Sequence, residues 1–336
     1  RAAGRAAPLP GVAARRLDPD SQDRGFSLPA AAEGVVPAST VLAAGGGRSR
    51  RLLGTCAFSD ETSGTYHVPD LGCQLSKMIV MASGDVLNIS GSSTAVPLDK
   101  LEAMGGAPTK SAPKRHFHVQ AGATLILAHL DVTGGRVFTS FIQDLNLRTN
   151  FYGGSVLIEG AEAKLIAAAT LFSGCFGTTC AFYGGAIHAG DGSTVEVASS
   201  TFYGNKAGNR GGALSVNGEQ TFATFTSSTF ESNSAAHHGG AIFVDNGGKL
   251  SLSGGDLHFA QNIASTGGAN IYLQGATPDQ LPLFDACPPN KYQDDTKNYN
   301  GHHHVVGDFT GCPHSCPLNK HAPWWGRNVG TAAQVC

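Results

Sequence analysis

A four-residue box built on two adjacent glycines recurs through the middle of the chain. It reads Gly-Gly-Ala-Ile from Gly184 and Gly239, Gly-Gly-Ala-Leu from Gly211, and Gly-Gly-Ala-Asn from Gly267. A weaker copy begins at Gly153. The second glycines of the boxes recur at intervals of 27 to 31 residues: Gly154, Gly185, Gly212, Gly240 and Gly268. A period of this length indicates supersecondary units that stack on one another.

A second box, Phe-x-x-Asn, alternates with the glycine box. Its copies are Phe202 to Asn205, Phe230 to Asn233 and Phe259 to Asn262, and a degenerate copy from Phe172 ends in cysteine at position 175. The runs between the boxes alternate apolar and polar residues over three to five positions, which is typical of short strands. Each repeat is therefore expected to hold about three short strands, and it must stack on its neighbours to bury its apolar side.

Parallel stacking places equivalent residues in columns about 4.8 Å apart. Ile187, Leu214 and Ile242 are expected in one inward column, and the three box phenylalanines in another. The glycine pairs suit a tight corner. The box asparagines are expected to form an amide ladder at a different corner. This pattern predicts a right-handed parallel β-helix of about seven coils.

The pairing of Gly-Gly-Ala-Ile with Phe-x-x-Asn resembles the repeat of the chlamydial polymorphic outer-membrane proteins, which also occurs in large surface proteins of algae and other protists. The resemblance implies a β-helix of the pectate-lyase-like superfamily and an extracellular or cell-surface location. It also implies a structural role for both boxes.

Composition divides the chain into three parts. Residues 1–51 form a basic arm rich in Ala, Gly, Pro and Arg, with eight arginines against four acidic residues. Residues 52–275 form the predicted β-helix. Residues 276–336 form a cysteine-rich tail, which is similar to small modules that follow β-helix arrays in protist surface proteins. The segment Arg48 to Arg51 fits a dibasic processing site or a solvated linker.

The chain has eight cysteines, an even number that favours an oxidising compartment. Cys56 and Cys73 are expected to tie a cap over the first coil, and Cys175 and Cys180 to close a local loop. The other four are expected to pair among themselves in an order left open: Cys287, Cys312, Cys316 and Cys336. Asn88, in Asn-Ile-Ser, is a candidate glycosylation acceptor.

The acidic residues of the repeats do not form an evident catalytic arrangement. Asp191 and Asp245 stand beside glycines, where aspartate is an ordinary turn residue. Three further acids fall at different phases of the repeat: Glu196, Glu231 and Asp256. Lyases and hydrolases built on β-helices need acids gathered on one outer face. No catalytic residue is therefore assigned, and an enzyme acting on polysaccharide is the alternative.

Histidines and tryptophans in the tail are candidate binding groups. The tail carries His302 to His304, His314 and His321 near Cys312 and Cys316, a spacing that suits zinc. Disulfides compete for the same thiols, so neither a metal nor a cofactor is expected. Trp324 and Trp325 suit either a sugar-stacking platform or, preferably, an apolar lid over the end of the solenoid.

These patterns predict a non-enzymatic extracellular protein that acts as a structural or adhesive building block of a surface layer, appendage or matrix. The formal net charge of −2 argues against nucleic acid as a partner, and no membrane-spanning segment is expected. The partners expected are further copies of the chain or other surface proteins. A polysaccharide-binding module is a further alternative. His188, Ser215 and Phe243 are predicted to form an outward lateral face, with Phe243 exposed.

Overall fold

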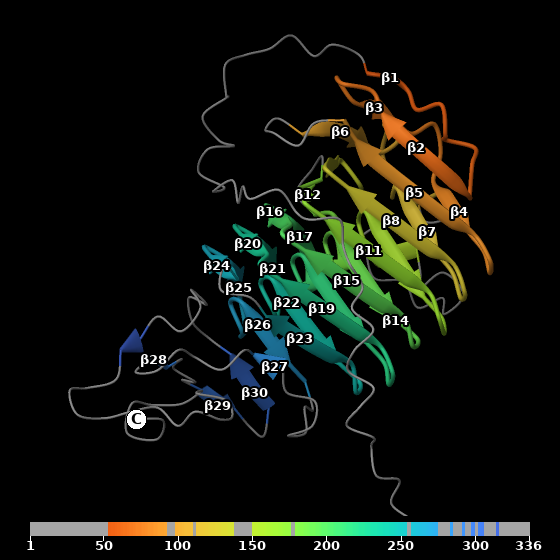
Figure 1. The fold of residues 1–336 in the computed structure, drawn as a ribbon. Helices are drawn as coiled ribbons and strands as arrows, with labels where there is room; N and C mark the ends of the chain where they lie inside the picture. The colour runs from red at the N-terminus through yellow and green to blue at the C-terminus, as the bar shows by residue number, and fades with distance from the viewer. Residues whose placement is uncertain are drawn as a thin grey trace, which may run out of the picture. The chain divides into compact units, whose positions relative to one another are not determined.

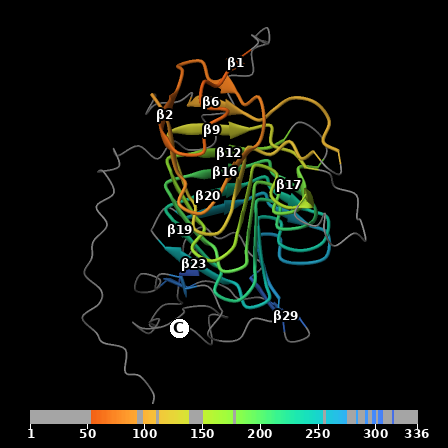
Figure 2. The same ribbon diagram turned by 90° about the vertical axis from the view of Figure 1, so that its right-hand side faces the viewer.

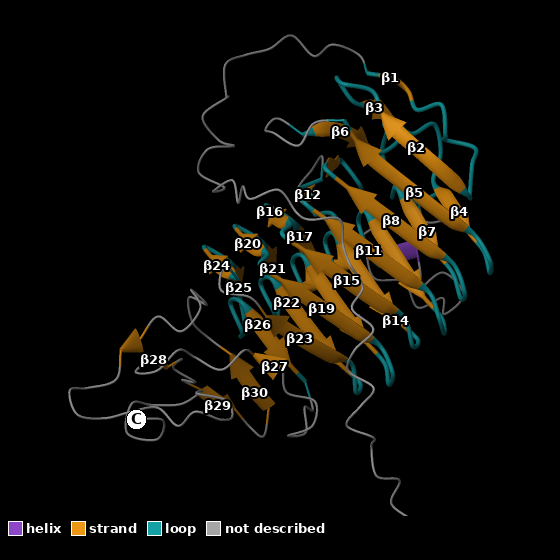
Figure 3. Cartoon of the chain, in the orientation of Figure 1, coloured by secondary structure: helices purple, strands orange, loops and turns teal. Residues whose placement is uncertain are grey.

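The computed structural model describes residues 53–92, 98–109, 112–137, 150–175, 179–253 and 257–274. It also gives the backbone of five short strands between residues 283 and 315. Short strands alternate with tight turns, and successive strands pass in rotation through the same sheets (Figures 1 and 3).

Three long sheets run along the stack, and each receives one strand from almost every coil. Sheet A contains β1 (Gly54–Thr55), β3 (Cys73–Gln74), β6 (Asp99–Glu102), β9 (Leu130–Thr133), β12 (Leu171–Ser173), β16 (Thr201–Tyr203), β20 (Thr229–Glu231) and β24 (His258–Ala260). Figure 2 shows its strands from β6 to β20 lying one above another. Sheet B contains β2 (Gly64–Val68), β5 (Val86–Gly91), β8 (Thr124–Ala128), β11 (Lys164–Ala168), β15 (Thr194–Ala198), β19 (Phe222–Thr226), β23 (Lys249–Ser253) and β27 (Leu283–Phe284).

Sheet C carries the strands that follow the glycine boxes. Its parallel strands are β4 (Ile79–Met81), β7 (Phe117–Val119), β10 (Val156–Glu159), β14 (Ile187–Gly190), β18 (Leu214–Asn217), β22 (Ile242–Asp245) and β26 (Ile271–Leu273). These seven strands confirm the predicted parallel β-helix of about seven coils. Two antiparallel strands continue the sheet beyond β26, namely β30 (His302–Val305) and β29 (Lys297–Tyr299). They cover the backbone edge of the last coil.

A fourth sheet distinguishes the later coils from the three-stranded unit expected. Sheet D contains β13 (Ala181–Tyr183), β17 (Lys206–Arg210), β21 (Ser234–Ala235) and β25 (Ile263–Ala264). These strands lie between sheet A and sheet C along the chain, and each leads into a glycine box. A separate antiparallel pair joins β28 (Lys291–Tyr292) to β31 (His314–Ser315).

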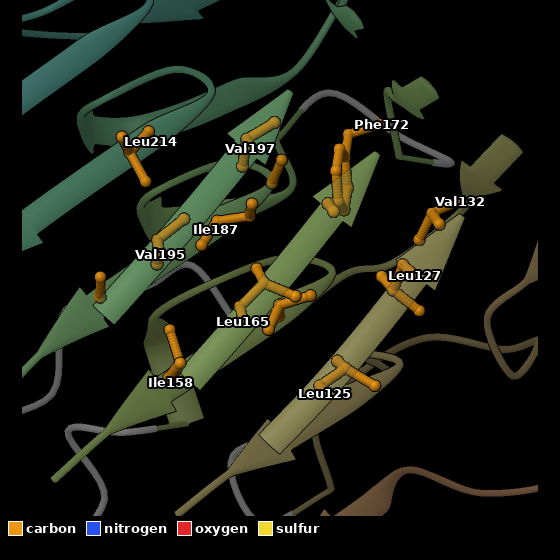
Figure 4. Close-up of a cluster of buried hydrophobic side chains, with 14 of the residues drawn as sticks. Leu125, Leu127, Val132, Ile158, Leu165, Phe172, Ile187, Val195, Val197 and Leu214 are labelled. Atoms are coloured by element: carbon orange, nitrogen blue, oxygen red, sulfur yellow. The ribbon is translucent and has the colours of Figure 1, made fainter. Parts of the chain in front are cut away.

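The core consists of the inward side chains of sheets A, B and C. The box phenylalanines stack in register, with ring centroids 4.8 Å apart between Phe172 and Phe202, and again between Phe202 and Phe230. Phe259 continues the same stack at 4.8 Å. Figure 4 shows the side chains of neighbouring coils meeting between the sheets, and its labelled residues are Leu125, Leu127, Val132, Ile158, Leu165, Phe172, Ile187, Val195, Val197 and Leu214. The alternation read from the sequence therefore places one face of each strand in this core.

The two glycines of each box have different tasks. The first has a left-handed backbone, with φ of 63° at Gly184, 66° at Gly211 and 64° at Gly239. The second allows close approach of the next coil, since a Cβ at Gly212 would collide with the backbone carbonyl oxygen of Gly240. Both tasks favour glycine, one for conformation and one for space.

The fourth box is shifted by one residue from the predicted alignment. We expected Gly268 in the column of Gly240, but the strands pair Ile242 with Ile271. Gly268, with φ of 64°, therefore continues the column of Gly239, and Ala269 takes the second position. At each earlier second glycine, the backbone of the next box occupies the space of a Cβ. Because Ala269 belongs to the last box, this constraint no longer applies.

The box asparagines form a buried ladder at the corner between sheets A and D. The side-chain Oδ1 of Asn233 accepts hydrogen bonds from the backbone N and the Nδ2 of Asn205, both at 3.0 Å. Its own Nδ2 donates to the carbonyl oxygen of Phe202 and to Oδ1 of Asn262. Asn262 in turn donates to Oδ1 of Asn270 at 3.0 Å. The asparagine of the last glycine box thus ends the ladder.

A second ladder, which sequence reasoning missed, lies at the corner between sheets B and A. The backbone N of Thr170 donates to Oγ of Ser200 at 3.1 Å, and that of Ser200 donates to Oγ of Ser228 at 3.3 Å. Each hydroxyl donates back to the carbonyl oxygen two residues earlier. The signal was present in the sequence as Ser-Ser-Thr-Phe, repeated from Ser199 and Ser227.

The two predicted disulfides among the described residues are present. Cys56 is joined to Cys73 at the first coil, with a Cα–Cα distance of 5.0 Å, and both side chains are buried. Cys175 is joined to Cys180 in the coil where cysteine replaces the box asparagine. The remaining cysteines lie outside the described residues: Cys287, Cys312, Cys316 and Cys336.

Candidate functional site

The outward side chains of sheet C form a single column across the coils. The strand register aligns His118 with Leu157, and Leu157 with His188. It continues the column through the residues Ser215, Phe243 and Tyr272. Their neighbours along each strand belong to the hydrophobic core, so this column points away from it. His188, Ser215 and Phe243 therefore occupy equivalent outward positions, as the repeat indicated.

The prediction that this lateral face is exposed is wrong. Phe243 and Ser215 are each 1% exposed, and His188 is 7% exposed. The cover comes from the residues that precede each glycine box, which are paired from coil to coil: Tyr152, Tyr183, Arg210 and His238. Each covering residue contacts the outward residue of the following coil, one strand beyond the strand that its own glycine box leads into.

Aromatic and cationic contacts hold this cover in place. The ring of Tyr152 lies 4.6 Å from that of His188, measured between centroids. The guanidinium of Arg210 lies 4.8 Å above the ring of Phe243. The ring of His238 lies 4.2 Å from that of Tyr272. We call the outward column of sheet C and its covering residues the lateral seam.

Charged groups at the first end of the seam surround one carboxylate. Nε2 of His118 and Oε1 of Glu159 are 2.8 Å apart. Burial acts to raise the pKa of Glu159, but the hydrogen bond from His118 and the charges of His118, His188 and Arg115 outweigh it. The net effect lowers that pKa from 4.5. Glu159 is therefore held as a carboxylate.

Burial has the opposite effect on the bases around it. It lowers the pKa of His188 from 6.5 to about 4, and the charge of Arg115 acts in the same direction against that of Glu159. Burial also lowers the pKa of Arg115 to about 9, with Glu159 opposing the change. His188 is therefore a neutral imidazole at neutral pH.

A second ion pair lies at the other end of the seam. Nη1 of Arg210 is 3.6 Å from Oδ2 of Asp245 and donates a hydrogen bond of 2.8 Å to Oε1 of Gln274. Burial raises the pKa of Tyr272, with Arg210 opposing and Asp245 supporting the shift. Asp245 was expected in a turn, but it is the last residue of β22 and its charge is paired.

The two carboxylates of the seam are too far apart to act on one bond. The register places Glu159 and Asp245 in one column, with β14 and β18 between their strands. Three strand spacings amount to about 14 Å. Paired carboxylates of glycoside hydrolases are separated by roughly 5 to 9.5 Å. Within the described ranges, no group of three or more His, Cys, Asp or Glu side chains could hold a metal ion.

The other candidate residues lie apart from the seam. Glu196 is on sheet B, where it pairs with Lys164, and Glu231 is on sheet A. Asp191 is an exposed turn residue with φ of 53°. Asn88 is a partly exposed residue of β5. Asp256, His321, Trp324 and Trp325 lie outside the described residues, as do the side chains of His302 to His304 and His314.

Sequence comparison identifies the repeat itself. Residues 199–217 and 227–245 match the model of the Chlamydia polymorphic membrane protein repeat. Each match runs from a Ser-Ser-Thr-Phe segment through the next glycine box into sheet C. No curated protein and no solved structure matches the chain. The resemblance inferred from Gly-Gly-Ala-Ile and Phe-x-x-Asn is confirmed, and the chain carries repeats of this type on a parallel β-helix.

Helices give no indication of a membrane span. In the part of the chain that the structure describes, no helix is long and apolar enough to cross a bilayer.

Proposed function

We propose that the protein is a non-enzymatic extracellular element that serves as a structural or adhesive building block of a surface layer, appendage or matrix. This proposal rests on one observation: the recurring residues all serve to pack one coil on the next. The box phenylalanines stack, the box asparagines form a ladder, and the box glycines allow coils to approach. What the repeat specifies is therefore a stiff stack, and the matched family is one of membrane proteins by its name.

The lateral seam supports the same proposal. Its two acidic groups are each paired with a base, and the rings of its outward column, Phe243 and Tyr272, are buried. A sugar-binding module of the kind considered would present an exposed aromatic row. Among the described residues, Phe222 is the one aromatic side chain among the exposed large hydrophobic groups.

The test has two arms on the full-length protein. A membrane-impermeant label applied to intact cells of the native source should modify the protein, because a surface element is accessible from outside. Incubation with a polyuronate and with a neutral polysaccharide should release neither unsaturated ends nor reducing ends.

Protection from the label on intact cells would overturn the surface role. Release of sugar ends would favour a polysaccharide-degrading enzyme. Glu159→Gln would then be the informative variant, because Glu159 is the carboxylate hydrogen-bonded to His118 at the first end of the seam. Glu231→Gln, on sheet A, is the matched control.

A further inference from the structure

The outer face of sheet B differs from the covered face of sheet C. Burial alternates along β8, β11 and β15, with every second side chain in the core and the others partly exposed. Half of the outward positions of β5 to β15 are apolar: Val86, Ile126, Ala128, Ile166, Ala168 and Ala198. The others are polar or charged: Asn88, Ser90, Thr124, Lys164, Thr194 and Glu196. We call the outward side chains of β5, β8, β11, β15, β19 and β23 the B face.

The apolar part of the B face lies on β8, β11 and β15. Ile126 and Ile166 are adjacent in one column, and Ala128, Ala168 and Ala198 are adjacent in the next. Val86 at one side is 49% exposed, and Phe222 further along is 42% exposed. The adjacent isoleucines and alanines thus form one apolar patch on β8, β11 and β15, whereas Val86 and Phe222 are separated from each other by the polar column Thr124, Lys164 and Thr194. A contiguous patch marks an interaction site more often than scattered single residues do.

One ion pair stands in the middle of this surface. Nζ of Lys164, on β11, is 2.8 Å from Oε1 of Glu196, on β15, and both side chains are partly exposed. The pair thus combines one positive and one negative group on adjacent strands, at the centre of the face. Such an arrangement is self-complementary across a two-fold axis.

We infer that the B face packs against the B face of a second copy of this chain, with the Lys164–Glu196 pairs of the two copies facing each other. A two-fold axis parallel to the strands, passing between β11 and β15, lays β11 of one copy over β15 of the other. Lys164 of each copy then comes near Glu196 of the other. The same axis lays Ala168 of each copy over Ala198 of the other, and Ile166 over the aliphatic part of Glu196. This inference rests on the proposed function, because a building block associates with further copies in the native material.

The size of the face sets the expected affinity. Six strands span five strand spacings, about 24 Å, and five residues of strand span about 17 Å. The face therefore covers roughly 400 Å² per copy, or about 800 Å² in total, which is below the roughly 1,000 Å² of a stable interface and in the range of weak, transient contacts. A contact of this size suits weak association, with a dissociation constant on the order of micromolar.

The glycosylation candidate lies on the same surface. Asn88 is in the outward column of Ile126, and is therefore part of the B face. A glycan on Asn88 would stand between the two copies. The inference therefore requires an unmodified Asn88 in the associated protein.

Charge reversal in the full-length chain tests the contact. Lys164→Glu and Glu196→Lys each bring like charges together at the proposed two-fold axis. We expect each variant alone to weaken dimerisation at least about tenfold in sedimentation equilibrium. Mixing the two variants should restore association to within a few-fold of the unaltered protein, because acidic faces then meet basic ones. Lys206→Glu, an exposed residue of sheet D, is the matched control and should change nothing.

The mixture separates a direct contact from damage to the fold. If both single variants associate as the unaltered chain does, or if their mixture fails to recover, the inference is overturned. A monomer at all concentrations also overturns it and points to another occupant of the face, such as residues 1–52. None of these outcomes bears on surface labelling or sugar release, which test the proposed function separately.

Discussion

Sheets B and C are built from the same coils, yet their outer faces differ. The outward column of sheet C carries His188, Phe243 and Tyr272, and each is less than 8% exposed. The outward column of sheet B carries Ile126 and Ile166, which remain partly exposed. The difference arises at the corners, because the chain enters sheet C through a left-handed glycine that folds the preceding residue over the sheet.

The two sheets show that outward apolar residues of a solenoid can be covered by the same chain or left open. On sheet C, apolar and polar groups are used within the chain to attach a covering layer. On sheet B, a similar alternation leaves an apolar surface available to a partner. An outward position in a β-helix is therefore not by itself an exposed one.

The largest effect is expected at the corner that creates the cover. In Gly212→Ala, the new Cβ collides with the backbone of Gly240 and Ser234, neither of which has a flexible end that can move aside. We expect a loss of about 4 kcal/mol or more in the free energy of unfolding, measured with urea. Gly54→Ala is the control, because nothing lies within 4 Å of its Cβ. A Gly212→Ala protein with an unchanged urea midpoint would contradict the register.

The next effect compares the two faces directly. Phe243→Ala removes a buried ring that contacts Arg210 and Tyr272, so we expect a loss of about 3 to 5 kcal/mol. Ile166→Ala removes a partly exposed side chain, and should cost about 1 kcal/mol or less in the monomer. Urea titrations below the dimerisation range measure both variants. Equal losses would mean that the two faces are equally covered.

Acid should weaken the seam. The pKa of His188 is lowered to about 4 in the folded chain, so below pH 6.5 the unfolded chain binds a proton that the folded chain excludes. Stability should therefore fall between pH 6.5 and pH 4, by up to about 2 kcal/mol at pH 5 for this group. Buried His116, with a pKa of about 4, contributes in the same direction.

Two variants isolate the seam's share of this acid effect. His188→Gln should reduce the difference in urea midpoint between pH 7 and pH 5, whereas His237→Gln, at an exposed position, should not. Glu159 acts at lower pH, since its lowered pKa provides stability that is lost as the carboxylate is protonated below about 4.5. An unchanged pH dependence in His188→Gln would contradict the burial of that imidazole.

The smallest effect concerns the two ion pairs. Lys164→Ala removes a partly exposed pair on the B face and should change monomer stability by less than about 1 kcal/mol, an effect that salt reduces further. Arg210→Ala should cost more, because Arg210 also covers Phe243 and bonds Gln274. Unfolding at low and high salt compares the two variants. A larger loss in Lys164→Ala would reverse the assignment of covered and open faces.

The stack of coils could be predicted from the sequence because each box meets a requirement of the local backbone. A glycine that needs a left-handed φ, or an asparagine that bonds the next coil, must recur once per coil. The one-residue shift at Gly268 escaped detection because Gly267 and Gly268 imitate the earlier pairs. The spacing from the box asparagine to the second position reveals it, since Ala269 follows Asn262 by seven residues, as Gly240 follows Asn233. The pairing of Ile242 with Ile271 agrees with that spacing.

The seam could not be predicted because its residues repeat only in part. Tyr152 and Tyr183 recur within the segment Phe-Tyr-Gly-Gly, but Arg210 and His238 take the same position in the later coils, so no motif runs the length of the seam. Period-two alternation separates inward from outward residues, and it does not show whether another part of the coil lies over the outward ones. The exposure of Phe243 was for this reason predicted wrongly, although its direction was predicted correctly.

Hydroxyl-radical footprinting of the unaltered protein tests the contrast between the faces most directly. The rates of modification at Phe243 and Phe222 compare the same chemical group on sheet C and on sheet B. We expect Phe243 to react as slowly as the core residue Phe230, and Phe222, at 42% exposed, to react many times faster. Modification of Phe243 at a rate close to that of Phe222 would contradict the covered seam, and with it the assignment of the B face as the open surface.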